Sequence, residues 1–178
     1  MATAQGDWAL LIDVDMSTPF GELSKFERLS HDSEVIVGTR KNGHSTVVVA
    51  EPIYRQVLGK VFTYLTQFVL GLQVSDFTCG FKLIKKDAYK DIAPKMRVER
   101  WGYDAEILYL ASKSNYAIAE VPVEWYNDAR TKVSLIKDMV RSLFDLIQIK
   151  WSGVTGCYES ETTRGNLNKE VATCLDET

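Results

Sequence analysis

The stretch Trp8-Ala-Leu-Leu-Ile-Asp-Val-Asp15 decides the fold class of this chain. Its first five residues are apolar, which predicts a strand buried on both faces of a sheet. Two aspartates follow, and Ser17-Thr-Pro19 with Glu22 then predicts a helix that runs to about Leu29. Because open α/β sheets place their ligands beyond the carboxyl ends of their strands, the two aspartates lie where a ligand site is expected.

The rest of the chain continues with further strand and helix patterns. Apolar runs predict strands at 34–39, 81–84 and 118–125, and Pro122 marks the last of these as an edge strand or a bulge. Apolar residues at helical spacing predict helices, which are 51–72, 86–92, 103–114 and 135–151. The predicted fold class is therefore α/β, with a mixed sheet flanked by helices.

Composition limits the class of protein. With 178 residues, of which 46% are hydrophobic, the chain can form one globular domain with its own core. A net charge of −3 gives no indication of nucleic-acid binding. The longest mostly apolar stretch, 61–72, is shorter than the roughly 20 residues that cross a membrane. We expect one domain over 1–151, no spanning helix, and a polar, disordered tail over 152–178.

Asp13 and Asp15 predict a site for a divalent cation. Alternate residues of a strand share a face, so both carboxylates can point at one Mg²⁺ or Mn²⁺ ion, which completes its shell with diphosphate oxygens and water. The pair could instead cap the helix that follows. It also matches the start of haloacid-dehalogenase-type phosphatases. That chemistry needs a second acidic pair at a later strand end, and no downstream strand ends in one.

Seven segments occur in a fixed order between about Gly6 and Lys150. They are Asp13-Val-Asp-Met-Ser-Thr-Pro19, Val37-Gly-Thr-Arg40, Pro52-Ile-Tyr-Arg55 with the residues up to Lys60, Asp76-Phe-Thr-Cys-Gly-Phe-Lys-Leu83, Trp101-Gly-Tyr-Asp-Ala-Glu-Ile-Leu108, Glu120-Val-Pro-Val-Glu-Trp125 and Lys132-Val-Ser-Leu135. In this order and spacing they resemble the family 2 glycosyltransferases, in the branch that contains dolichyl-phosphate β-glucosyltransferases. Ser-Thr-Pro after the acidic pair favours the glucosyl branch over the mannosyl branch.

The resemblance implies a GT-A (Rossmann-like) fold and a role for each matching residue. Asp13 and Asp15 would hold the cation that bridges the donor's diphosphate, with Ser17 at the position of a possible third ligand. Arg40 and Arg55 correspond to basic residues near the diphosphate and the acceptor phosphate. An ordinary surface charge is the alternative interpretation for each arginine.

The other matching residues correspond to the sugar and acceptor site. Asp76 and Glu106 match acidic positions there, and Asp104 is a near alternative. Lys132 and Ser134 match a loop that closes over the acceptor. Asp76 could instead cap a turn before Gly80, and Glu106 could be a simple helix-surface acid.

The resemblance implies transfer of a hexose, glucose from UDP-glucose, to a dolichyl or other polyprenyl phosphate with inversion at the sugar. A phosphate monoester has a second pKa of about 6, so it is already a nucleophile near neutral pH and needs no strong base. The reaction needs positive charge to gather two anionic reactants and a Lewis acid on the leaving diphosphate. Arginine suits the first task because its planar fork binds phosphate through two hydrogen bonds.

The helix pattern at 135–151 combines an apolar stripe, ending in Trp151, with Lys137, Arg141 and Lys150. This combination is typical of a helix in a membrane interface, and equally of a helix packed on a sheet. Together with the resemblance it predicts a cytoplasmic protein that lies peripherally on a membrane, the endoplasmic reticulum in a eukaryote. The expected partners are a nucleotide sugar, a polyprenyl or dolichyl phosphate and the membrane surface, and no nucleic acid.

Members of this family begin with a strand and a Pro-x-Tyr-Asn-Glu-like segment that holds uridine, and nothing before Gly6 resembles it. The expected fold is therefore a truncated GT-A domain, whose open sheet edge a partner chain could cover. A truncated gene model, a split protein and an inactive copy all stay open as explanations. The alternative functions are a non-catalytic remnant that binds lipid or a partner chain, and an enzyme like the dolichyl-phosphate mannosyltransferases.

Overall fold

The computed structural model describes residues 4–41, 45, 53–99, 102–126 and 135–158. Within these residues one sheet has four strands in the order β1 (Trp8–Leu11), β3 (Lys82–Lys85), β2 (Val35–Thr39) and β4 (Ile118–Pro122). β3 is antiparallel to β1 and β2, whereas β2 and β4 are parallel. The mixed sheet confirms the predicted α/β class. It also places the carboxyl ends of β1, β2 and β4 together, next to the start of β3. We call this end of the strands the sheet edge.

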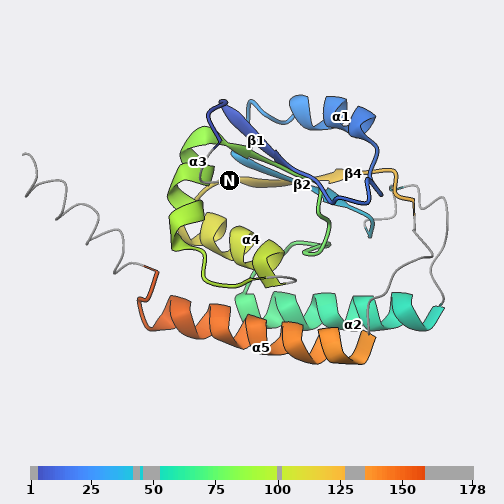
Figure 1. Ribbon diagram of the computed structural model, residues 1–178, viewed down its shortest axis with the longest axis vertical. Helices are drawn as coiled ribbons and strands as arrows, with labels where there is room; N and C mark the ends of the chain where they lie inside the picture. The colour runs from blue at the N-terminus through green and yellow to red at the C-terminus, as the bar shows by residue number, and fades with distance from the viewer. Residues whose placement is uncertain (1–3, 42–44, 46–52, 100–101, 127–134, 159–178) are drawn as a thin grey trace, which may run out of the picture.

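Helices cover both faces of this sheet (Figure 1). In chain order they are η1 (Phe20–Glu22), α1 (Leu23–Glu27), α2 (Ile53–Leu70), α3 (Lys86–Ile92), η2 (Ala93–Lys95), α4 (Tyr103–Lys113) and α5 (Leu135–Val154). α1 lies on one face, and α3 and α4 lie on the other. α2 and α5 run side by side as an outer layer beyond α4.

The side chains of β2 show how the sequence builds two cores. Val35 and Val37 point to the core shared with α3, α4 and α5, and Ile36 points to the core shared with α1. This alternation follows from the two-residue period of a strand. Every residue of β2 is buried because the strand has a neighbour on each side and helices on both faces.

The prediction for the first strand is wrong in its burial and its length. β1 is an edge strand, paired with β3 alone among the described residues, so only Ala9 is buried. It ends at Leu11, and Asp13 and Asp15 lie in a turn beyond it. The backbone N–H of Met16 donates to the carbonyl of Asp13 at 3.0 Å, and Met16 has a positive φ of 53°. The two aspartates therefore do not share a strand face.

The predicted tail begins too early. α5 continues to Val154, and Tyr158 is buried in the main core against Tyr109. Residues 152–158 are thus part of the folded body, whereas 159–178 lie outside the described residues. In the parts of the chain that the structure describes, no helix has both the length and the apolarity to cross a membrane.

Candidate functional site

The shared edge of the sheet brings together segments that are far apart in the sequence. Asp13 follows β1, Arg40 follows β2, and Trp125 follows β4. The guanidinium carbon of Arg40 lies 5.2 Å from the centre of the Trp125 ring. The carboxyl group of Asp13 rests on Gly80, just before β3, so closely that a Cβ at position 80 would overlap it. These contacts define the candidate site.

Arg40 and Asp76 form a two-pronged ion pair at this edge. The Nε and one terminal nitrogen of Arg40 donate to the two Asp76 oxygens at 2.7 and 2.9 Å, and the Arg40 backbone N–H donates at 3.1 Å. Burial alone would raise the pKa of Asp76, but Arg40 and then Lys41 outweigh it and hold that pKa well below its usual range. Asp76 is therefore a fixed, fully buried carboxylate that orients Arg40, not a proton acceptor.

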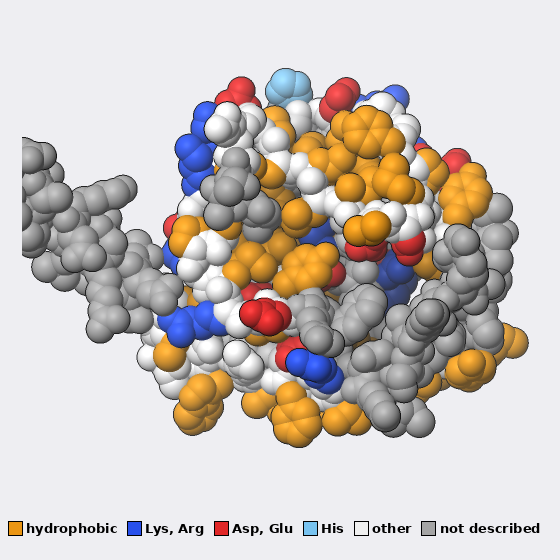
Figure 2. All heavy atoms as spheres, in the orientation of Figure 1, with side chains coloured by type: hydrophobic (Ala, Val, Ile, Leu, Met, Phe, Trp, Pro, Cys, Tyr) orange, Lys and Arg blue, Asp and Glu red, His pale blue; other side chains and the backbone are white. Residues whose placement is uncertain are grey.

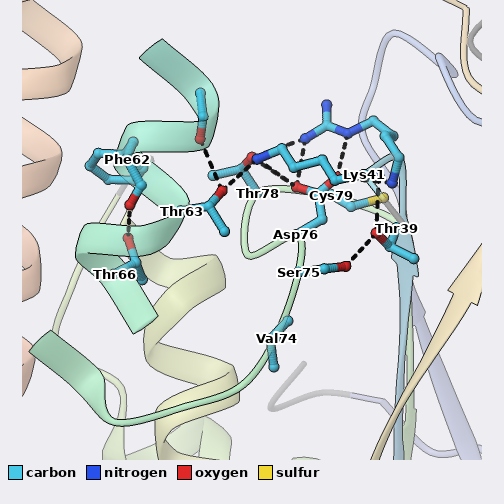
Figure 3. Close-up of polar contacts among 12 residues, drawn as sticks. Thr39, Lys41, Phe62, Thr63, Thr66, Val74, Ser75, Asp76, Thr78 and Cys79 are labelled. Carbon is cyan, nitrogen blue, oxygen red and sulfur yellow. Dashed lines mark hydrogen bonds and ion pairs between the residues drawn. The ribbon is translucent and has the colours of Figure 1, made fainter. Parts of the chain in front are cut away.

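Lys41 links this pair to α2. Its Nζ lies 3.5 Å from an Asp76 oxygen and donates to Thr63 Oγ1 of α2 at 2.8 Å, and Figure 3 shows it between the two residues. Hydrogen bonds to two strands hold the loop before β3: the Ser75 hydroxyl is hydrogen-bonded to the Thr39 hydroxyl of β2, and Ser75 donates to the Glu120 carboxylate of β4. Arg40 and Lys41 thus bring two cationic side chains to the same part of the edge, both within ion-pair distance of Asp76.

The neighbouring part of the edge is acidic. Desolvation by the surrounding protein, and then the nearby Asp15 carboxylate, raise the pKa of Asp13, while Lys82, Arg40 and the Gly80 backbone N–H oppose the rise. Asp15 also accepts a hydrogen bond from the backbone N–H of Ser17 at 3.0 Å. Ser17 itself is buried, and its carbonyl accepts from the backbone N–H of Tyr126 at 2.9 Å.

Asp104 joins this edge, and Glu106 does not. Residues two apart on a helix point to nearly opposite sides. Asp104 accepts a hydrogen bond from the ammonium of Lys82. The Glu106 carboxylate instead accepts from the backbone N–H groups of Arg97 and Val98, both at 2.9 Å, and from the Tyr158 hydroxyl at 2.7 Å. Glu106 thus ties two chain segments to α4, and the geometry gives it a structural role rather than the predicted place in the site.

The other predicted residues fall outside what can be described. The backbone of Arg55 lies in the first turn of α2, but its side chain is outside the described residues, as are Lys132 and Ser134. Sequence reasoning missed Lys82. Its signal was a lone charge inside an apolar strand pattern, in a position where charged side chains are rare unless paired.

The acidic part of the edge fits a metal ion whose ligands come partly from the protein and partly from substrate and water, rather than a site made of protein ligands alone. Among the described residues, no three His, Cys, Asp or Glu side chains gather around one point. Mg²⁺ keeps several ligands for water and substrate phosphates and needs only one or two protein carboxylates. After desolvation, the negative charge of Asp15 is the next largest cause of the raised pKa of Asp13, and such a cation would relieve this repulsion.

A mixed α/β sheet with its polar residues at one strand edge is consistent with part of a Rossmann-like GT-A fold. No family model matches the chain. It is similar to curated proteins named dolichyl-phosphate beta-glucosyltransferase, over most of its length. The identity is 29% for Dictyostelium discoideum (88% of this chain, 50% of that protein), 30% for Saccharomyces cerevisiae (86% and 50%) and 27% for Homo sapiens (91% and 52%).

These similarities support the resemblance to dolichyl-phosphate β-glucosyltransferases that the seven segments indicated. The chain spans about half the length of the curated relatives it matches.

Proposed function

We propose that this chain carries the metal-binding and acceptor-binding part of an enzyme that transfers glucose from UDP-glucose to a dolichyl or other polyprenyl phosphate. The observation that carries the proposal is the divided charge of the sheet edge. The cationic side chains Arg40 and Lys41 lie at the same edge as the acidic residues Asp13 and Asp15. A nucleoside diphosphate bound with a divalent cation has charges of both signs that match this edge. The relatives' names indicate the reaction, glucosyl transfer to dolichyl phosphate.

Each residue of the sheet edge has its own role in the proposed reaction. Asp13 and Asp15 would hold Mg²⁺ or Mn²⁺, which supplies a Lewis acid for the leaving diphosphate. Arg40, oriented by Asp76, attracts phosphate oxygens. The buried Asp76 cannot serve as a base, and none is required, because a phosphate acceptor is already anionic near neutral pH. A single displacement without a covalent enzyme intermediate would invert the sugar.

The direct test is a transfer assay on the full chain. Purified protein is incubated with radiolabelled UDP-glucose, Mn²⁺ and a polyprenyl phosphate, and the organic phase is counted. We expect glucose in the lipid phase with Mn²⁺ and none after chelation with EDTA, because without the cation the carboxylates repel the diphosphate and no Lewis acid stabilises it as it leaves. A chain with neither transfer nor metal-dependent UDP binding would instead be the non-catalytic remnant.

We also propose that α2 and α5 lie against the membrane that holds the lipid acceptor. Exposed apolar residues recur every three to four positions on each helix, which makes one stripe per helix. The most exposed are Ile53, Tyr64, Phe68, Phe144, Trp151 and Val154. Figure 2 shows apolar side chains along the side of the molecule where Figure 1 places these two helices. The opposite side of α2, with Thr63 and Thr66, is buried.

Replacing Phe68 and Trp151 with serine is expected to lower partition into phosphatidylcholine vesicles about 100-fold. Both side chains are exposed, at 87% and 69%. Moving an aromatic side chain from water into an apolar phase contributes about 1.5 kcal/mol or more. Vesicle flotation measures the effect. The matched control is Phe20→Ser, since Phe20 is also exposed but precedes α1 on the other side of the sheet. Equal losses for the double variant and the control would contradict the membrane face.

A further inference from the structure

Lys82 is a lysine with no exposed surface, in the first position of β3. Its Nζ donates to the carbonyl of Cys79 at 2.5 Å and to the carboxylate of Asp104 on α4. Lysine side chains are almost never fully buried unless paired, because removing the ammonium from water is unfavourable. Lys82 therefore has one specific ion-pair partner, the carboxylate of Asp104.

The ion pair of Lys82 and Asp104 lies at the acidic part of the sheet edge. Lys82 comes two residues after Gly80, on which the Asp13 carboxyl group rests. Burial raises the pKa of both Asp13 and Asp104, and Lys82 lowers both. One ammonium thus acts on two carboxylates, one after β1 and one on α4.

Asp104 also acts on the neighbouring side chain of α4: burial, and then the Asp104 and Asp13 carboxylates, raise the pKa of Tyr103. Asp104 retains 7% of its exposure, so it is close to the surface of the edge rather than deep in the core.

We propose that Lys82 is a positioning residue of this site, whose ammonium holds the Asp104 carboxylate at the sheet edge beside Asp13. In this arrangement α4 contributes a fixed acid to an edge otherwise built by strand ends. This inference rests on the proposed function and adds a role to it, in which Asp104 accepts hydrogen bonds from hydroxyl groups of the donor sugar. A carboxylate in a fixed orientation selects for the sugar hydroxyls that reach it, and Lys82 sets that orientation.

A purely structural pair would behave differently from a positioning pair. If Lys82 only neutralised a buried acid, removing both charges would restore everything that removing one destroys. The discriminating variants are Lys82→Met, Lys82→Arg and the double variant Lys82→Met/Asp104→Asn. The matched control is Lys86→Met, because Lys86 lies close by in the chain but is partly exposed, with Asp7 as its ion-pair partner at 3.5 Å.

The transfer assay and thermal unfolding are run together on these variants. We expect Lys82→Met to melt at a lower temperature and the double variant to recover most of that loss. We expect kcat to stay about 10- to 100-fold low in both, the loss that follows when a supporting partner of a site residue is removed. Lys82→Arg should regain part of the activity, and Lys86→Met should match the wild type. A double variant that recovers both stability and kcat would overturn the proposal.

A second measurement does not depend on turnover. The ammonium of Lys82 is followed by nitrogen-15 NMR of the full chain, with Lys86 as the internal reference. We expect a slowly exchanging Lys82 signal that Asp104→Asn removes and that Mn²⁺ broadens more strongly than it broadens the Lys86 signal. A Lys82 signal unaffected by Asp104→Asn or by Mn²⁺ would refute the positioning role. Wild-type protein without transfer would refute the proposed function, and the Lys82 inference would still be decided by this signal.

Discussion

Asp13→Asn is expected to lower kcat/KM for glucosyl transfer on the order of 1,000-fold. Asparagine keeps the shape of the side chain over Gly80 but removes one of the two charges that would hold the cation. Partial burial, and then the nearby Asp15 carboxylate, raise the pKa of Asp13, so a cation beside the two acids would be favourable. Transfer rates at several Mn²⁺ concentrations measure the effect, and Mn²⁺ should only partly restore the rate.

The control for this variant is Asp7→Asn. Asp7 lies shortly before β1, and its carboxyl group is 90% exposed, so the change removes the same charge away from the sheet edge. We expect Asp7→Asn to transfer glucose like the wild type. Acid should also weaken Mn²⁺ binding to the wild type at a higher pH than an ordinary aspartate would predict, because protons compete with the cation for Asp13, whose pKa is raised in the metal-free protein. An Asp13→Asn protein with unchanged Mn²⁺ dependence would rule out this ligand.

The approximate positions of the four strands, and the end of the sheet at which the polar residues gather, could be predicted from the sequence. The apolar run before Arg40 forms β2, and the acids after the first apolar run lie at the same edge, because β1 and β2 point in one direction. The burial of β1 could not be predicted, since an apolar run reads the same in a central strand and at a sheet edge. The position of a strand in the sheet depends on pairings between distant segments.

The ion-pair partners of the charged residues could not be predicted from the sequence either. Arg40 and Asp76 are 36 residues apart, and Lys82 and Asp104 are 22 apart, so no local pattern joins them. Asp104 and Glu106 could have been separated from the sequence, because two positions on a helix face nearly opposite ways. The segments that resemble the family identified which residues gather at the edge, but only the structure shows that Asp76 holds Arg40.

Arg40→Met is expected to lower the free energy of unfolding by about 3 kcal/mol at pH 7. The change leaves the fully buried carboxylate of Asp76 without its two-pronged partner, and breaking a buried ion pair from one side is strongly destabilising. Lys41, at 3.5 Å, remains and keeps the loss near the lower end of the usual range. Urea unfolding of the two proteins measures the difference.

The double variant Arg40→Met/Asp76→Asn is the control, and it should recover most of the loss because no unpaired charge stays buried. The pH dependence gives an independent check. The folded pKa of Asp76 lies below its unfolded value, so its stabilisation is complete above about pH 4 and decreases as pH falls toward the folded value. Without Arg40, burial raises the folded pKa instead, and acid then relieves the unpaired charge. The difference between wild type and Arg40→Met should therefore shrink from pH 7 to pH 3, and a constant difference would show that Arg40 stabilises the edge by packing on Trp125 rather than by its charge.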